Sequence, residues 1–260
     1  MRKMTVWLLL FVFVSAEAQY NPYQYSITKK VEVSNGAVVS AHPLASKVGV
    51  ALLKKGGNAF DAAIATQLAL AVVYPGAGNI GGGGFLVATT AKNEYVALDY
   101  REKAPAAAGR DMYLDKDGNA QTNLSQNGHL ASGVPGTIAG LFSTHKYAKI
   151  PFKQLIQPAI DLAEKGFVIT EAEANSLNNY AGEFVRYSTK PNAFIKYGGW
   201  KAGDTLIQKD LANTLKRIRD FGQKGFYEGE TAKLIVAEMK RGGGLITLAD
   251  LKNYQTAIRE

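Results

Sequence analysis

The sequence contains no cysteine, which excludes disulfide bonds, a thiol nucleophile and thiolate metal sites. Histidine is almost as scarce, since the chain has only three, far apart and without metal-ligand spacing. After the N-terminal region, no apolar run reaches the length that a membrane-spanning helix needs. Stability must therefore come from packing, and no residue pattern indicates a metal or any other cofactor.

Charge is plentiful but not concentrated. The chain has 260 residues, of which 47% are hydrophobic and 20% charged, enough to bury a sizeable core. The net charge is +8, yet the lysines and arginines are scattered and do not alternate with aromatic residues. This distribution favours a basic surface over nucleic-acid binding.

The first eighteen residues have the pattern of a secretory signal peptide. Arg2 and Lys3 give a positive start, residues 6–14 are apolar, and residues 16–18 offer small side chains for cleavage. The apolar run is too short for a permanent membrane anchor. We therefore expect residues 1–18 to be removed from an exported protein, periplasmic or secreted.

The remaining chain divides into an extended arm at residues 19–35 and a folded domain over residues 36–260. Residues 37–40 are expected to form a short buried strand, and two strands over residues 85–90 and 94–100 a hairpin. Helices are expected over residues 43–55, 59–73, 135–146, 151–165, 171–180, 210–221, 228–241 and briefly after 247. This order predicts an α+β fold, with an antiparallel sheet covered by helices on one side.

The helix over residues 59–73 shows the clearest local signals. Asn58 is a good N-cap, and Asp61 three residues later suggests a variant of the capping box. The helix is apolar nearly all round, which is typical of a helix buried on most sides.

The stretch "NIGGGGFLV", residues 79–87, places four glycines in a row. A phosphate-binding loop needs a strand before its glycines and a helix after them, so that the helix N-terminus faces the anion. Here the predicted helix comes first and the predicted strand second. We therefore expect tight backbone packing with positive φ angles in the turn, rather than nucleotide binding.

Other polar motifs favour structural roles. The loop over residues 115–126 begins like a calcium loop, but its glycine stands at the fourth position, so an ordinary turn is favoured. His42 and His129 are interpreted as structural, and His145 as exposed on a helix. No serine, histidine and aspartate set can be argued from spacing.

Arg101 is different, because it stands at the end of the second hairpin strand in "ALDYREKAPAAA". A guanidinium there, beside a glycine-rich turn, is well placed to hold a carboxylate with two parallel N–H bonds. The alternative is a surface ion pair with Asp99, Glu102 or Asp111. Chemistry alone favours the ion pair, because exposed ion pairs are common.

Several segments resemble the gamma-glutamyltranspeptidase family, also called gamma-glutamyltransferase or glutathione hydrolase. They occur in family order across roughly residues 36–258 and are highly specific together, although no single one is. The matching segments are "SAHPLASKVGVALLKKGGNAFDAAIATQLALAVVYPGAGNIGGGGFL", "ALDYREKAPAAA", "HLASGVPGTIAGL", "LIQPAIDLAEKGF", "KAGDTLIQKDLANTLKRI" and "FYEGETAKLIVAEMKRGGGLITLADLKNY".

The resemblance implies an N-terminal nucleophile (Ntn) hydrolase fold, an αββα sandwich of two antiparallel sheets between helical layers. It also implies an exported precursor that cuts itself into a large and a small subunit. The new N-terminal threonine of the small subunit attacks gamma-glutamyl amides such as glutathione and forms an acyl-enzyme. The glutamyl group then passes to water or to an amino acid, while backbone donors stabilise the oxyanion.

On the family pattern, Arg101 matches the arginine that binds the α-carboxylate of the gamma-glutamyl group, which reverses the preference for an ion pair. Glu102 follows it as support, without a chemical step of its own. Residues 36–260 correspond to the N-terminal portion of the large-subunit domain.

The chain stops at Glu260, inside the region that resembles the large subunit. No catalytic residue is therefore assigned within it, and the nucleophilic threonine is expected beyond residue 260. We expect this chain to be inactive alone and to need the C-terminal part and the small subunit of the same precursor as partners. Uncovered sheet edges and apolar faces would make it poorly soluble.

Two alternatives stay open at this point. Related acylases of the family act on glutaryl side chains of beta-lactams such as cephalosporins, and the groups that distinguish them lie in the small subunit. The other alternative is an exported, non-catalytic binding protein made from the truncated half.

Overall fold

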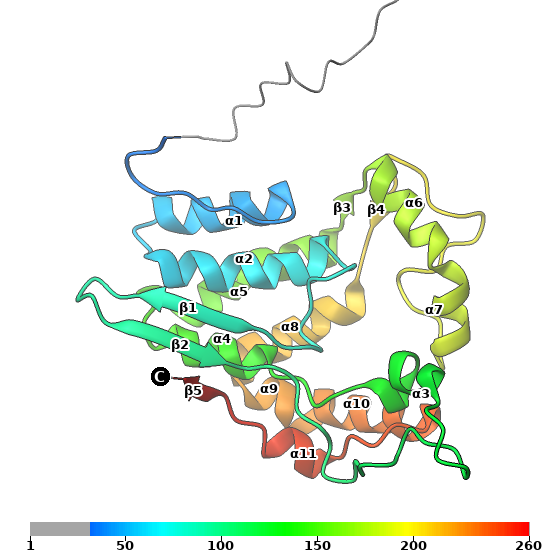
Figure 1. Cartoon of the computed structure of the whole chain (residues 1–260). Helices are drawn as coiled ribbons and strands as arrows, with labels where there is room; N and C mark the ends of the chain where they lie inside the picture. Colours follow the sequence, from blue (N-terminus) through cyan, green and yellow to red (C-terminus); the bar gives the residue numbers. More distant parts are fainter. Residues whose placement is uncertain (1–31, 260) are drawn as a thin grey trace, which may run out of the picture. The chain divides into compact units, whose positions relative to one another are not determined.

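Figure 1 shows the protein as a computed structural model that describes residues 32–259. The predicted signal peptide, residues 1–18, and most of the predicted arm, residues 19–35, lie outside the described residues. The chain divides into two compact units, residues 1–36 and 37–260. All helices and strands of the described part belong to the second unit.

The second unit combines helices with short strands. Its described helices are, in chain order, α1 (Pro43–Lys54), α2 (Ala59–Val73), α3 (Thr122–Gln126), the 3-10 helix η1 (His129–Ala131), α4 (Thr137–His145), α5 (Phe152–Lys165), α6 (Glu171–Asn179), α7 (Ala181–Tyr187), α8 (Lys209–Phe221), α9 (Lys224–Tyr227), α10 (Gly229–Gly242) and α11 (Leu248–Lys252). Its described strands are β1 (Phe85–Thr89), β2 (Tyr95–Asp99), β3 (Phe167–Val168), β4 (Thr205–Leu206) and β5 (Ala257–Arg259).

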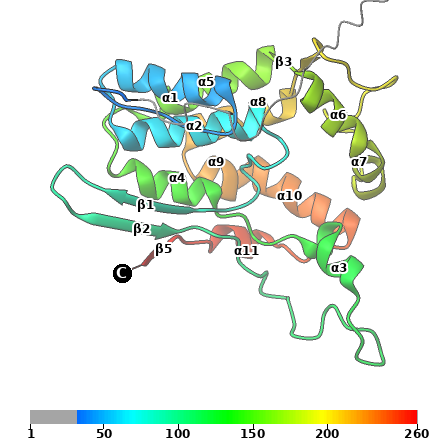
Figure 2. The same ribbon diagram turned by 45° about the horizontal axis from the view of Figure 1, so that its top comes forward.

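Helix α2 lies at the centre of the core. It packs against both α1 and α5, and α5 packs in turn against α8 (Figures 1 and 2). In α2 the side chains of Ile64, Leu68 and Val72 are completely buried. Burying each such side chain contributes roughly 1.5–3 kcal/mol, which explains why a helix that is apolar on all sides takes the central position. The predicted bounds and burial of this helix are confirmed.

A capping box begins α2, as the sequence predicted. The Asn58 side chain accepts hydrogen bonds from the backbone N–H groups of Phe60 and Asp61, and the Asp61 carboxylate accepts one from the Asn58 N–H at 2.7 Å. That carboxylate is fully buried and also accepts hydrogen bonds from the amides of Lys149 and Ile150. One side chain thus fixes both the start of α2 and the loop that leads into α5.

The main sheet is antiparallel, with the strand order β1-β2-β5, and its register sets Val87 opposite Ala97. Val96 and Leu98 are buried on the face of β2 that packs toward α4. The opposite face is open, since Val87 is 84% exposed and Tyr95 is 89% exposed. The prediction of an antiparallel sheet covered by helices on one side is confirmed.

The predicted strand over residues 37–40 is wrong. This segment has no regular structure, and Val39 is 93% exposed. Val38 instead lies over α1, where a Cβ on Gly49 would come within 2.8 Å of its Cγ1 atom. The packing on a helix replaces the strand pairing that the apolar sequence suggested.

The other long helices occur within a few residues of their predicted bounds. Pro158 lies inside α5 without ending it, and α4 begins at Thr137 rather than at Pro135. The short helices α3, α7 and α9 were not predicted, and neither were the short strands β3, β4 and β5.

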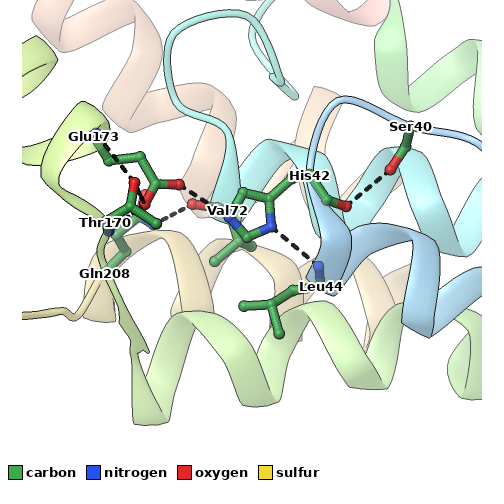
Figure 3. A network of polar contacts seen from close by, with 7 residues as sticks. All are labelled: Ser40, His42, Leu44, Val72, Thr170, Glu173 and Gln208. Atoms are coloured by element: carbon green, nitrogen blue, oxygen red, sulfur yellow. Dashed lines mark hydrogen bonds and ion pairs between the residues drawn. The ribbon is translucent and has the colours of Figure 1, made fainter. Parts of the chain in front are cut away.

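A polar network joins α1 to α6 around His42, which is buried (Figure 3). The Nδ1 atom of His42 accepts a hydrogen bond from the Leu44 N–H and caps α1, so the neutral ring donates from Nε2 to Glu173 at 3.0 Å. The other carboxylate oxygen of Glu173 accepts hydrogen bonds from Thr170 and caps α6. Nearby, Gln208 donates to a carbonyl in the last turn of α2 at 2.7 Å.

The other two histidines also hold elements together. His129 lies 2.9 Å from a carboxylate oxygen of Glu238 and links η1 to α10. His145 is half-buried, with its Nε2 atom 2.9 Å from the Ile150 carbonyl and its ring edge-on to Phe152. The prediction that His145 is exposed was therefore wrong.

Candidate functional site

Arg101 lies two residues after the end of β2, and its exposed side chain lines a cavity of about 780 Å³. The cavity wall also includes Gly81 of the glycine run, together with Lys103, Tyr113 and Ser132. In the part of the chain that the structure describes, no hydrogen bond or ion pair engages the guanidinium of Arg101. The cation is therefore free to receive an anion from solution.

Two of the three carboxylates proposed as ion-pair partners of Arg101 pair with other arginines. Asp99 pairs with Arg259 at 2.5 Å, and this hydrogen bond holds the pKa of Asp99 below its ordinary value. Asp111 pairs with Arg110 at 3.7 Å. Within residues 32–259 no ion pair joins Arg101 to Asp99, Asp111 or Glu102, so the ion-pair interpretation is wrong.

Glu102 lies between two glycines. A Cβ on Gly82 would come within 2.9 Å of the Oε1 atom of Glu102, and a Cβ on Gly133 within 2.9 Å of its Cβ atom. Its side chain thus packs beside the glycine run and lines the same cavity as Arg101.

Both backbone polar groups of Arg101 are held by side chains. Its N–H donates to the Oδ1 atom of Asp99 at 3.1 Å, and its carbonyl accepts a hydrogen bond from the Tyr254 hydroxyl at 2.7 Å. Sequence reasoning missed Tyr254, because it lies 153 positions further along the chain and no local motif marks it.

The glycine run packs against the backbone of Tyr100 and Arg101. A Cβ on Gly83 would come within 2.5 Å of the Tyr100 carbonyl oxygen and 2.7 Å of the Arg101 Cα atom, distances that no side chain tolerates. The expectation of close backbone packing is confirmed. The expectation of positive φ angles is wrong, since none of the glycines at 81–84 adopts one. Space, rather than backbone conformation, requires glycine here.

The same loop is tied to the start of α4. The carbonyl of Gly82 accepts hydrogen bonds from the amides of Gly136 and Thr137 at 2.7 and 3.0 Å. The Oδ1 atom of Asn79 accepts one from the Gly82 N–H and another from the buried Thr137 hydroxyl. Amides at a helix start that could otherwise attract an anion are thus occupied by the protein itself.

The chemistry available in this cavity is the binding of a carboxylate. A guanidinium presents its N–H donors in a rigid planar fork that matches two carboxylate oxygens. The hydroxyl groups nearby are not activated, because Tyr113 donates to the Leu130 carbonyl at 3.1 Å and no hydrogen bond joins Ser132 to a base among the described residues. From residues 32–259 the cavity receives a cation for binding and no nucleophile paired with a base.

Residues 32–259 hold no cluster of three or more histidine, aspartate or glutamate side chains arranged for a metal ion. The Asp115 carboxylate, which begins the suspected calcium loop, accepts hydrogen bonds from the amides of Asp117 and Asn119 at 2.9 Å and closes an ordinary turn. Over the same described range, every helix is too short or too polar to span a bilayer.

Comparisons with known proteins give a matching family and several similar proteins. The family model described as Gamma-glutamyltranspeptidase matches residues 45–260. A curated relative from Pseudomonas sp. (strain A14), named "Glutathione hydrolase proenzyme", is 50% identical over 229 residues, which are 87% of this chain and 40% of that protein. The chain thus spans about two fifths of the length of this relative.

Solved structures give the same result for the fold. The crystal structure of Helicobacter pylori gamma-glutamyltranspeptidase matches with a TM-score of 0.86 and 48% identity, over 89% of this chain and 67% of that one. The cephalosporin acylase from Bacillus halodurans matches with a TM-score of 0.76 but only 29% identity, over 93% of this chain and 46% of that one.

Proposed function

The chain belongs to the gamma-glutamyltranspeptidase family, and from this premise we propose that it forms the N-terminal part of the large subunit of a glutathione hydrolase precursor. Its fold is α+β and of the Ntn hydrolase type, with one sheet covered by helices on one side in the described residues. The relative from Pseudomonas is named as a proenzyme and extends well beyond the matched region, which supports the assignment to a precursor.

The proposed whole enzyme cleaves gamma-glutamyl amides such as glutathione. The nucleophile is the N-terminal threonine of the small subunit, encoded beyond residue 260, and its own α-amine accepts the hydroxyl proton. The threonine oxygen bonds to the amide carbon, the C–N bond breaks, and the amine leaves with that proton. Water or the amino group of an amino acid then attacks the glutamyl ester and frees the threonine.

The observation that carries this proposal is the unpaired guanidinium of Arg101 in its cavity. The α-carboxylate of a gamma-glutamyl group has two oxygens that a guanidinium binds through parallel N–H bonds, roughly twice as strong as neutral hydrogen bonds. A glutamyl group held at this end can extend its amide toward the nucleophile. Arg101 is therefore proposed as the substrate-binding residue that this chain contributes.

The open sheet face is proposed as the contact with the rest of the precursor. Phe85 is 63% exposed, Val87 84% and Tyr95 89%, and all three lie on the face away from α4. Neighbouring apolar side chains exposed on a sheet typically mark an interaction site. A second sheet from the C-terminal part of the precursor would cover them, and without it this chain is expected to aggregate.

Export is the proposed fate of the precursor, to the periplasm or to the medium. The support is the charged start, apolar run and small-residue cleavage pattern of residues 1–18 in the sequence. A glutaryl-cephalosporin acylase activity is not favoured, because identity to the solved acylase is 29% against 48% to the solved transpeptidase.

Replacing Arg101 in the full-length, mature enzyme tests the proposal. Arg101→Ala removes two charge-assisted hydrogen bonds and is expected to raise KM for a gamma-glutamyl donor about 100-fold. Arg101→Lys, which keeps the charge but loses the fork, should give an intermediate KM. The matched control is Arg110→Ala, because the Arg110 side chain is 96% exposed on the same loop. An unchanged KM in Arg101→Ala would remove Arg101 from the site.

A further inference from the structure

The Tyr254 side chain is buried against the backbone of Arg101. Its hydroxyl donates to the Arg101 carbonyl at 2.7 Å, and the residue is only 8% exposed. Arg101 lies just beyond the last pairs of β1 and β2, where Tyr100 still exchanges hydrogen bonds with Gly84. The Arg101 carbonyl therefore depends on this phenol instead of on a strand partner.

We propose that Tyr254 is a positioning residue for Arg101, which fixes the backbone from which the substrate-binding guanidinium projects. This inference rests on the proposed function of Arg101. The Tyr254 hydroxyl holds the peptide plane after Arg101, and the Asp99 carboxylate holds the plane before it at 3.1 Å. With both planes held, the direction of the Cα–Cβ bond of Arg101 is fixed, so the side chain starts from one orientation.

Tyr254 belongs to a segment that runs along the end of β2 and the residues that follow it. Residues 250–259, here named the brace segment, contact residues 99–106 at several further points. The Asp250 carboxylate accepts a hydrogen bond from the Ala106 amide at 2.8 Å, and the Lys103 ammonium donates to the Gln255 carbonyl at 2.8 Å. Strand β5 pairs with β2 at the end of this segment (Figure 1). The phenol is thus one of several contacts that set the same stretch of backbone.

Tyr254 is itself held rigidly. Its ring lies parallel to that of Tyr227, with 5.9 Å between centroids and an angle of 3°, and the Lys103 ammonium lies 5.0 Å from its centroid. A Cβ on Gly136 would come within 2.1 Å of the Tyr254 hydroxyl, so only glycine leaves room for the phenol. A group confined on these sides can position its partner with little freedom of its own.

The phenol also stays a donor at all working pH values. Burial, with smaller contributions from the negative charges of Asp99 and Glu102, raises the pKa of Tyr254 to about 12. A protonated phenol donates to a carbonyl, whereas a phenolate would repel it. The Tyr254 hydroxyl contacts the Arg101 backbone and not the proposed substrate, so it acts through Arg101.

Tyr254→Phe in the full-length, mature enzyme tests this role, because phenylalanine keeps the ring contacts and loses only the hydroxyl. KM for a gamma-glutamyl donor should rise about fivefold, with kcat changed less than about twofold. In an Arg101→Ala background the same substitution should leave KM unchanged, because no guanidinium remains to be positioned. The matched control is Tyr187→Phe, whose hydroxyl contacts Asn123 at 3.5 Å, away from the cavity.

The outcomes distinguish substrate binding by Arg101 from positioning of Arg101 by Tyr254. If Arg101→Ala leaves KM unchanged, the proposed function of Arg101 fails. If Arg101→Ala raises KM but Tyr254→Phe does not, only the positioning role fails. An equal rise of KM for Tyr254→Phe in both backgrounds also overturns it, since the tyrosine would then act independently of Arg101. If thermal melting shows that Tyr254→Phe is not folded, Asp99→Ala removes the other backbone contact of Arg101 and carries the same expectations for KM, with Arg259→Ala as the control for the ion pair that it also breaks.

Discussion

The carboxylate of Asp61 accepts a hydrogen bond from the backbone amide of Ile150 at 2.8 Å, across 89 positions of the chain. Asp61 is completely buried, and its other partners are the amides of Asn58 and Lys149. Every partner is a donor, so the site suits an ionised carboxylate. The contact connects the start of the central helix α2 to the loop before α5.

Asp61→Asn should destabilise the full-length protein by about 3 kcal/mol, because its new NH₂ group would face backbone donors and leave buried amides without an acceptor. Urea unfolding of the purified variant measures this loss. Asp161→Asn is the matched control. Asp161 is only half-buried, and asparagine keeps the Oδ1 atom that accepts the hydrogen bond from Gln157. Equal stability of the two variants would contradict the structural role of Asp61.

The glycine run offers a comparison within one loop. Gly83→Ala would place a Cβ 2.5 Å from the Tyr100 carbonyl, whereas no atom lies within 4 Å of a Cβ on Gly81. Such overpacking costs about 1–3 kcal/mol, so Gly83→Ala should lower the melting temperature by several degrees and Gly81→Ala should not. Differential scanning calorimetry of the two variants makes the comparison. Equal melting temperatures would mean that the loop can move away from Arg101 freely.

The lowered pKa of Glu238 predicts that the protein loses stability in acid. Partial burial alone would raise its pKa, but hydrogen bonds from Thr189, His129 and Arg241 outweigh this and lower the pKa to about 2. A lowered pKa means that the stabilisation is present above the ordinary value of 4.5 and is lost as pH falls toward 2. After allowance for solvent screening, we expect roughly 1–2 kcal/mol from this group.

Glu238→Gln should therefore reduce stability at neutral pH and flatten its decline between pH 5 and about 2. Thermal melting of both proteins across this pH range tests the expectation. Parallel curves would show that Glu238 contributes nothing to acid sensitivity.

The open sheet face predicts a defect in assembly. If the rest of the precursor covers Val87, which is 84% exposed in this chain, then Val87→Lys introduces a charge into a buried interface. The contact between this chain and the rest of the precursor should lose the roughly 1.5–3 kcal/mol that burial of a valine contributes, and burial of the charge adds a further cost. The yield of mature enzyme should therefore fall strongly. The control is Val39→Lys, at a position 93% exposed before α1. Normal maturation of Val87→Lys would show that solvent covers this face in the whole enzyme.

Local signals explain what the sequence could predict. Helix α2 was found with its bounds because Asn58, Asp61 and an apolar run lie within sixteen consecutive residues, 58–73. The hairpin of β1 and β2 was also found, because its partners are close in sequence. In α1 the buried residues are Ala45, Gly49 and Leu52, while Leu44 and Val48 are partly buried against the same core. Small residues face the neighbouring helix there, and hydrophobicity alone does not reveal this.

Distant contacts explain what the sequence could not predict. Arg101 stood out through its place at a strand end and through family resemblance, but the partners of its backbone did not. Tyr254 lies 153 positions from Arg101, and Arg259 lies 160 positions from Asp99. Such pairs arise only when β5 docks beside β2, which is a property of the tertiary fold and leaves no local pattern.

The separation between Arg101 and the brace segment also sets an order of events during biosynthesis. At about 5–20 residues per second, a ribosome needs roughly 8–30 s to add the 153 positions between Arg101 and Tyr254. Throughout that interval the arginine has left the peptidyl transferase centre while its phenolic partner has not yet been made. A nascent chain interrupted before residue 254 would therefore lack the phenolic donor to the Arg101 carbonyl, and of the two side chains that hold the Arg101 backbone only Asp99 would be present.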